Sequence, residues 1–182
     1  SDNGPEGNIM EMGQPWDNSR FEDWGKKGTF IQYGPAWAQA SAGPLRLFKG
    51  FLSEGGIRTP LILSGPGVTE GGRISDAVTH IMDIPATILE AAGVAHPESF
   101  EGRQVAPLQG KSLSPILSNV SQAVRAPSDW LGWELFGNRA IRQGNWKLLW
   151  LCEPYGAGHW QLYDLKADQG ETTDLVAEHP DI

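Results

Sequence analysis

Lys-Gly-Phe-Leu-Ser-Glu-Gly-Gly-Ile-Arg-Thr-Pro, residues 49–60, is the stretch that says most about the fold of this chain of 182 residues. Its paired glycines and final proline are typical of a turn. The apolar run 61–63 follows and ends at the second turn 65–67, so the pattern predicts a buried strand between two turns. Lys49 lies in a glycine-flanked apolar context, and its ammonium suits a tetrahedral oxyanion such as sulfate or phosphate, although a solvated surface lysine fits the same pattern.

The clearest helix signal lies between Asp83 and Gly93. Ile84, Ile88 and Leu89 recur at a spacing that places their side chains on one face of a helix. Aspartate is a favoured N-cap residue, and glycine commonly ends a helix in the left-handed conformation. The pattern therefore predicts a helix with Asp83 as its N-cap and Gly93 as its C-terminal cap.

Short aromatic-rich runs, separated by turn sequences such as Gly-Asn and Gln-Gly-Asn, fill the C-terminal part of the chain. Consecutive runs joined by such turns favour a small antiparallel sheet. The runs cover residues 130–136, 140–142, 146–151 and 160–165. A small, polar segment precedes them, so we place a domain boundary near Asn119.

Composition and charge argue against several classes of protein. The net charge is -8 and the pI is near 4.9, which leaves no broad basic surface to neutralise the phosphates of a nucleic acid. No stretch approaches the roughly 18 consecutive apolar residues that a membrane-spanning helix needs. Cys152 is the single cysteine, so an internal disulfide framework is excluded and the cellular compartment is left open. We expect neither a nucleic-acid partner nor a membrane partner.

Candidate metal ligands occur at the start of the chain. Ser-Asp-Asn-Gly, residues 1–4, places the carboxylate of Asp2 beside the amide oxygen of Asn3. Calcium and magnesium prefer hard oxygen ligands of this kind, although Asp-Asn-Gly is also an ordinary turn sequence. The histidines lack a mutual metal-ligand spacing, and we expect solvated or structural roles for them. They are His80, His96, His159 and His179.

The Ser-Asp-Asn-Gly run and the 49–60 stretch together resemble the second half of the catalytic lobe of type I sulfatases, in the alkaline phosphatase-like superfamily. Further matches follow in order along the chain: Tyr-Gly-Pro-Ala-Trp-Ala-Gln-Ala at 33–40, Met-Asp-Ile-Pro-Ala-Thr at 82–87, Trp-Glu-Leu-Phe-Gly at 133–137, Ala-Ile-Arg-Gln-Gly-Asn-Trp-Lys at 140–147 and Gln-Leu-Tyr-Asp-Leu at 161–165. In order and spacing they are similar to the C-terminal part of a bacterial-type arylsulfatase.

The resemblance implies an α/β fold. Residues 1–118 would be the C-terminal portion of the mixed-sheet catalytic lobe, and residues 119–182 a small antiparallel-sheet subdomain. In the family pattern Asp2 and Asn3 match a late pair of calcium ligands. Lys49 matches the lysine that contacts the substrate sulfate.

The resemblance also implies a function for an intact parent protein: it would hydrolyse small-molecule sulfate esters, with calcium and a formylglycine nucleophile made from a Cys/Ser-x-Pro/Ala-x-Arg motif. Residues 152–156 begin like this motif, but Gly156 stands where arginine is required, so we interpret Cys152 as structural or incidental. The nucleophile would then lie outside this chain. We expect the chain alone to be inactive, and to self-associate through exposed sheet edges.

Two other hypotheses remain open at this point. A phosphatase or phosphonate monoester hydrolase of the same superfamily is one, because sulfate and phosphate esters share a tetrahedral geometry. A non-catalytic binding or structural module is the other, because Cys152, the single cysteine, does not lie in the nucleophile motif.

Overall fold

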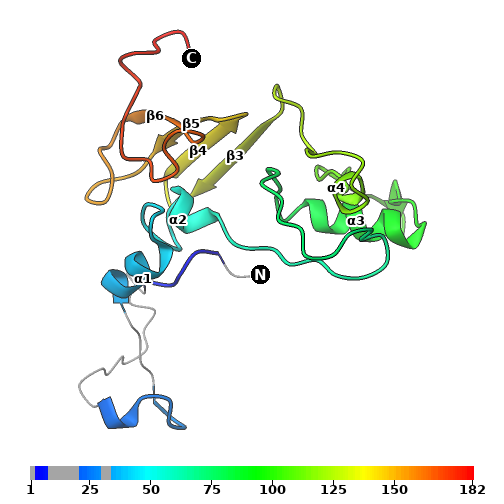
Figure 1. Cartoon of the computed structure of the whole chain (residues 1–182), viewed down its shortest axis with the longest axis horizontal. Coiled ribbons are helices and arrows are strands. Elements are labelled where there is room, and N and C mark those ends of the chain that lie inside the picture. The colour runs from blue at the N-terminus through cyan, green and yellow to red at the C-terminus, as the bar shows by residue number, and fades with distance from the viewer. Residues whose placement is uncertain (1–2, 8–20, 30–33) are drawn as a thin grey trace. The chain divides into compact units, whose positions relative to one another are not determined.

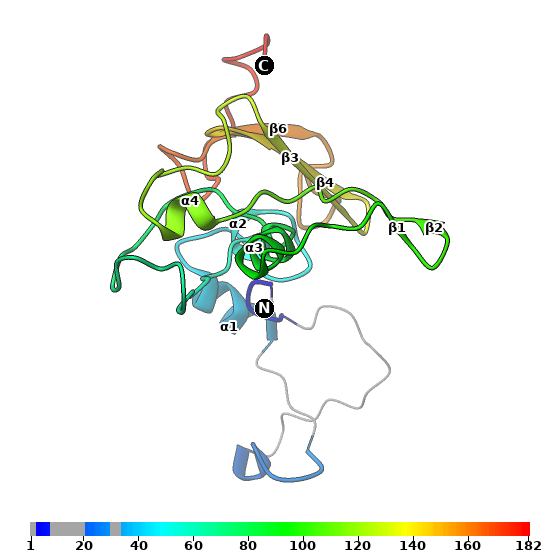
Figure 2. The same cartoon turned by 90° about the vertical axis from the view of Figure 1, so that its right-hand side faces the viewer.

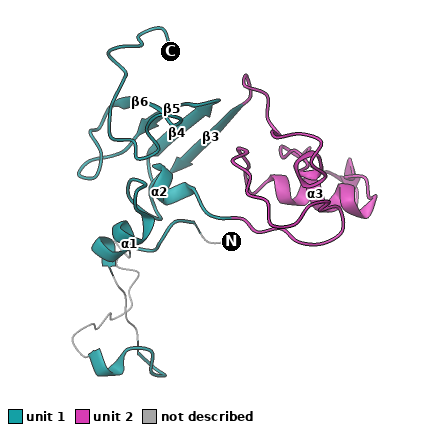
Figure 3. Cartoon of the chain, viewed as in Figure 1, with its two compact units in different colours: residues 1–60, 130–182 teal, residues 61–129 magenta. Residues whose placement is uncertain are grey.

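A computed structural model of the chain describes residues 3–7, 21–29 and 34–182. These residues divide into two compact units (Figure 3). The first unit combines the described residues up to Pro60 with Trp130–Ile182, and the second is Leu61–Asp129. In the described part of the chain, no helix is both long enough and apolar enough to cross a membrane.

The first unit is built on an antiparallel sheet, four-stranded among the described residues, in which each strand pairs with the next along the chain (Figure 1). Its strands are β3 (Trp130–Leu135), β4 (Asn138–Gln143), β5 (Trp146–Trp150) and β6 (Trp160–Asp164). The sheet predicted from the aromatic-rich runs is therefore confirmed. Phe136 and Gly137 join β3 to β4 and both have positive φ, as a tight hairpin turn requires.

One face of this sheet carries the core of the first unit. Along β5 every second residue is buried, so Lys147 and Leu149 lie on the covered face. The helices α1 (Gly34–Ala42) and α2 (Glu54–Ile57) belong to the same unit, as does the short 3-10 turn η1 (Phe21–Asp23). The buried cluster combines residues of α1, of the segment before α2, and of the strands and the positions directly after them: Ala38, Phe48, Phe51, Leu52, Ala140, Leu149, Leu151, Tyr163 and Leu165.

The second unit contains the predicted helix, α3 (Asp83–Ala92), with Gly93 in the left-handed conformation at its C-terminus, as expected. It also contains the one-turn helix α4 (Ser114–Leu117) and a hairpin of the two-residue strands β1 (Ser99–Phe100) and β2 (Arg103–Gln104), which is visible in Figure 2.

The predicted role of Asp83 as N-cap is wrong. Met82 is the N-cap residue and Asp83 is the first residue of α3. Its carboxylate is fully buried and accepts backbone hydrogen bonds from His80 at 2.7 Å and Lys111 at 2.9 Å. The guanidinium of Arg125 adds two hydrogen bonds of 2.6 Å each. Asp83 thus joins three segments of the second unit. Its bidentate hydrogen bonds with the Arg125 guanidinium are of the strong, charge-assisted kind.

The strand predicted at 61–63 is also not formed. These residues have no regular structure, and Ile62 is 91% exposed. A strand is stabilised by hydrogen bonds to a neighbouring strand, and no strand of the described residues pairs with this run. The first unit combines two separate stretches of the chain, whereas the predicted boundary divides the chain once, into 1–118 and 119–182. That boundary stays a prediction about the longer protein.

Candidate functional site

Lys49 lies within a closed loop of the first unit. Residues 46–55, which we call the Lys49 loop, are closed at their base by a 2.9 Å hydrogen bond from the Gly55 amide to the Arg46 carbonyl. Within the loop the Phe51 amide donates to the Phe48 carbonyl at 3.2 Å. Both phenylalanine side chains are buried in the core. Apolar packing of the two phenylalanines thus anchors the loop, whereas the Lys49 side chain between them stays partly exposed.

The segment that follows Asn3 lies along this loop. The Gly4 amide donates to the Gly56 carbonyl at 3.0 Å, and the Lys49 amide donates to the Pro5 carbonyl at 3.0 Å. A Cβ at Gly4 would lie 1.8 Å from the Gly55 carbonyl oxygen, so only glycine allows the two backbones to approach this closely. Two motifs that are distant in the sequence are therefore neighbours in the fold.

The predicted site residues have different standing in this arrangement. Asn3 is exposed, and Asp2 lies outside the described residues. The Lys49 side chain is 36% exposed, and its Nζ lies 3.3 Å from Oε2 of Glu6. The backbone hydrogen bonds place the segment of Asn3 beside that of Lys49, whereas the roles of Asp2, Asn3 and Lys49 in binding metal and sulfate stay predictions.

The donor set at the start of the chain fits part of a calcium site. Asn3 offers an exposed amide oxygen, which is a ligand type that calcium accepts. Among residues 3–7, 21–29 and 34–182, however, no group of three or more His, Cys, Asp or Glu side chains could hold a metal ion. Further ligands from outside the described residues would be needed to complete the coordination.

A buried charged cluster lies behind the loop, and the sequence did not predict it. Nζ of Lys147 lies 2.9 Å from Glu54 Oε1 and 2.8 Å from Glu171 Oε1, and the side chains are 0%, 4% and 0% exposed. The Glu54 amide also donates to Glu171 Oε2 at 2.8 Å. Burial raises the pKa of Glu171, and the neighbouring Glu54 adds to this, although Lys147 opposes it. A lysine on the covered face of β5 was the signal that could have revealed this cluster.

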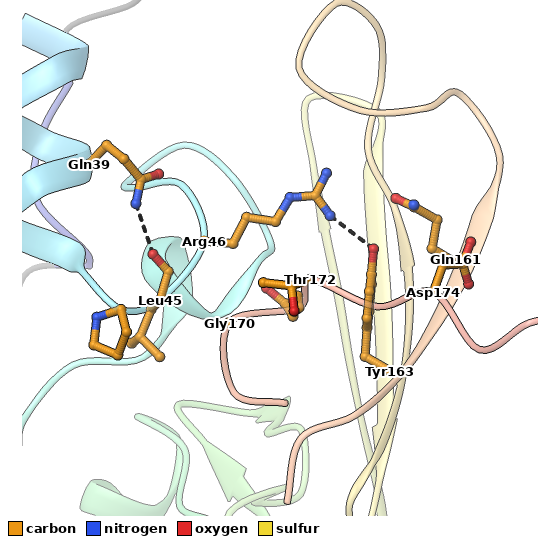
Figure 4. Close-up of a pocket in the computed structure, with 10 residues that line it drawn as sticks. Gln39, Leu45, Arg46, Gln161, Tyr163, Gly170, Thr172 and Asp174 are labelled. Carbon is orange, nitrogen blue, oxygen red and sulfur yellow. Dashed lines mark hydrogen bonds between the residues drawn. The ribbon is translucent and has the colours of Figure 1, made fainter. Parts of the chain in front are cut away.

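A second polar contact links the loop to the sheet. Nη1 of Arg46 donates to the hydroxyl of Tyr163 at 2.9 Å, and both residues line a cavity of about 550 Å³ (Figure 4). Burial raises the pKa of the Tyr163 hydroxyl, and the opposing charge of Arg46 offsets only part of this rise. The cavity is lined by Gln39, Pro44, Leu45, Arg46, Gln161, Tyr163, Gly170, Glu171, Thr172 and Asp174. Arg46 therefore contributes both to the base of the loop and to a polar hollow beside it.

Cys152, by contrast, belongs to no such cluster among the described residues. Its thiol is free and the residue is exposed, and its amide donates to Oδ1 of Asn138 at 2.9 Å. Cys152 lies two residues after the end of β5, and its interpretation as structural or incidental stays a prediction.

A family model described as N-sulphoglucosamine sulphohydrolase, C-terminal, matches residues 44–181 of the chain. This range includes the Lys49 loop, all of the second unit and the four-stranded sheet. The match therefore covers all three residues of the buried charged cluster, Glu54, Lys147 and Glu171.

Curated relatives extend the similarity. A Schizosaccharomyces pombe protein named as an uncharacterized sulfatase is 44% identical over 194 residues, which cover 100% of this chain and 34% of the relative. An arylsulfatase of Klebsiella aerogenes is 37% identical over 107 residues, which cover 58% of this chain and 23% of the relative. The chain thus spans about a third or less of the length of these relatives.

A solved structure has a similar fold. The crystal structure of Ps i-CgsB in complex with k-i-k-neocarrahexaose matches with a TM-score of 0.64 and 22% sequence identity, over 81% of this chain and 31% of that chain. At this level of identity the likeness concerns the fold alone.

Proposed function

This chain belongs to the type I sulfatase family, and we propose that it forms the C-terminal part of a longer enzyme that hydrolyses sulfate esters. The family match over residues 44–181 supports this proposal, as do the relatives named as sulfatase and arylsulfatase. Because the chain spans only about a third or less of the length of those relatives, the activity is proposed for the longer protein.

One observation carries the proposal to specific residues: the Lys49 loop and the segment after Asn3 are hydrogen-bonded neighbours. In our proposal the ammonium of Lys49 contacts the sulfate group of the substrate. The Lys49 side chain is 36% exposed, so it can reach a ligand, and an ammonium with three donors suits a tetrahedral anion. The carboxylate of Glu6, 3.3 Å from Nζ, would keep the charge of Lys49 compensated before the substrate binds.

Asp2 and Asn3 are the proposed contribution of this chain to a calcium site. The hard oxygen donors of these two residue types support this assignment. Calcium, when bound, would withdraw negative charge from the sulfate oxygens. Lys49 would act on the same anion from the neighbouring loop, so that this chain binds and orients the sulfate group.

The attacking nucleophile is proposed to come from outside these residues. No Cys/Ser-x-Pro/Ala-x-Arg motif for formylglycine surrounds Cys152, since Gly156 replaces the arginine. Residual binding groups cannot replace a missing nucleophile. The chain of 182 residues would therefore bind part of the substrate without cleaving it.

The experiment compares the longer protein with its Lys49→Met variant on a chromogenic aryl sulfate. Loss of the sulfate contact is expected to lower kcat/KM by about a hundredfold. Lys166→Met, which changes an exposed lysine outside the loop, is the matched control and is expected to keep the activity. The isolated chain is a second control and is expected to show no turnover.

A paired aryl phosphate separates sulfatase from phosphatase activity. Sulfate and phosphate esters share a geometry and differ in charge, so an enzyme can discriminate between them. If the longer protein is a sulfatase, turnover of the sulfate ester is expected to dominate. A preference for the phosphate ester, or unchanged kcat/KM in Lys49→Met, would contradict the proposal.

A further inference from the structure

The base of the Lys49 loop is attached to the sheet on both sides of its closing hydrogen bond. Arg46, whose carbonyl accepts that bond, reaches the hydroxyl of Tyr163 on β6 at 2.9 Å. Glu54, which precedes the donor Gly55, reaches Nζ of Lys147 on β5 at 2.9 Å. Each end of the loop therefore has its own polar contact with a strand.

The two strand residues form one platform. Lys147 and Tyr163 are direct partners in the register of β5 and β6. Residues directly opposite in an antiparallel pair project from the same face of the sheet. Both side chains are buried, at 0% and 1% exposure. The sheet thus presents an adjacent ammonium and hydroxyl to an adjacent carboxylate and guanidinium at the base of the loop.

The loop has little freedom to adjust independently of this platform. A Cβ at Gly55 would lie 2.1 Å from the Leu47 carbonyl oxygen, and a Cβ at Gly56 would lie 2.1 Å from that of Phe51. On the other side, the Gln39 amide group of α1 donates to the Leu45 carbonyl and accepts from the Leu47 amide. Because close-packed structures transmit displacements rather than absorb them, a shift at the base moves the whole loop.

We propose that Lys147 and Tyr163 are positioning residues, which set the place of the Lys49 ammonium by holding both ends of its loop against the sheet. The inference rests on the proposed contact between Lys49 and the substrate sulfate. Neither residue needs to touch the substrate. A buried ion pair is a poor source of stability compared with apolar packing, whereas its directional contacts fix the register of the parts that it joins.

The test uses the longer protein and two substitutions that act on different ends of the loop. Tyr163→Phe removes one hydroxyl and keeps the aromatic ring in the core, while Lys147→Met removes the buried ammonium. Each is expected to raise both the KM for an aryl sulfate and the inhibition constant for inorganic sulfate by about tenfold, because small displacements of a positioned group weaken its contact steeply. A role in stability alone would lower the amount of active enzyme and leave both constants unchanged.

A double-mutant cycle identifies the route of the effect. Combined with Lys49→Met, neither Tyr163→Phe nor Lys147→Met is expected to raise the inhibition constant for sulfate further, since the contact that they position is already lost. Leu162→Ala is the matched control: it opens a cavity at a buried residue of β6, whose backbone bonds run to Asp174 and Leu175. This control is expected to lower the melting temperature without changing either constant.

The outcomes separate the two proposals. An unsubstituted protein that hydrolyses no sulfate ester would overturn the proposed function, and this inference with it. An active protein in which Tyr163→Phe keeps both constants, or in which its effect adds fully to that of Lys49→Met, would overturn the inference alone. Tyr163→Phe decides the question even if Lys147→Met does not fold, because it leaves the core volume almost unchanged.

Discussion

Glu171 is a buried carboxylate that shares one ammonium with a second carboxylate. Lys147 lies 2.8 Å from Glu171 and 2.9 Å from Glu54, so the cluster carries an excess negative charge when all three groups are ionised. Burial is the main cause that raises the pKa of Glu171. The folded protein therefore holds a proton on Glu171 at pH values where the unfolded chain has released it.

A pH dependence of stability follows from this residue. Since the folded state binds the proton more tightly, the contribution of Glu171 to the free energy of unfolding is full below the ordinary glutamate pKa of about 4.3 and falls as the pH rises through the raised pKa. Glu171→Gln, which resembles the protonated form, is expected to remove this slope. Denaturant midpoints measured across the pH range for both proteins check it, and parallel curves would contradict the raised pKa.

At the scale of single residues, the sequence singled out Lys49 as a candidate but did not predict the buried charged cluster at the base of its loop. Lys49 lies in a short, distinctive stretch, whereas Glu54 and Lys147 are 93 positions apart, and Glu54 and Glu171 are 117 apart. Periodicity and motif spacing describe local structure. A buried ion pair between distant segments leaves no local pattern beyond a charged residue in an apolar run.

Helix α3 and the antiparallel strands could be predicted from the sequence because periodicity and turn residues are local signals. The end of α3 at Gly93 depends on one residue's left-handed conformation. Its start does not depend on local capping alone: the carboxylate of Asp83 is held by Arg125 and the Lys111 amide from other segments, as well as by the nearby His80 amide. Burial alone would raise the pKa of Asp83, but the hydrogen bonds from Arg125, Lys111 and His80 outweigh it and lower that pKa.

Arg125→Met tests this account of how the second unit is held together. Removing the guanidinium leaves a buried carboxylate without its charged partner, which is expected to cost about 3 kcal/mol of stability. Arg103→Met, an exposed arginine of β2 in the same unit, is the matched control and is expected to change stability little. Denaturation followed by circular dichroism measures both, and equal midpoints for the two variants would show that the pair with Asp83 is dispensable.

For the whole molecule, the run 61–63 marks the limit of prediction from this chain. Its apolar sequence between two turns is typical of a buried strand, yet the run is exposed and without regular structure in the second unit. A strand needs a partner, and the described residues supply none to this run. Under the proposed function, residues outside this chain would supply that partner, so the local pattern and the observed exposure are compatible.

Ile62→Lys is expected to reduce self-association of the isolated chain and to destabilise the longer protein. In the isolated chain, an exposed apolar run with an unpaired backbone favours pairing between copies. A charge at Ile62, which is 91% exposed, should therefore lower the average mass measured by light scattering. In the longer protein the same lysine would enter a buried strand and lower the melting temperature, because an unpaired charge is costly to bury. Val120→Lys, at a position 82% exposed in the same unit, is expected to change neither measurement. If Ile62→Lys left the melting temperature of the longer protein unchanged, the run would be a surface segment there too.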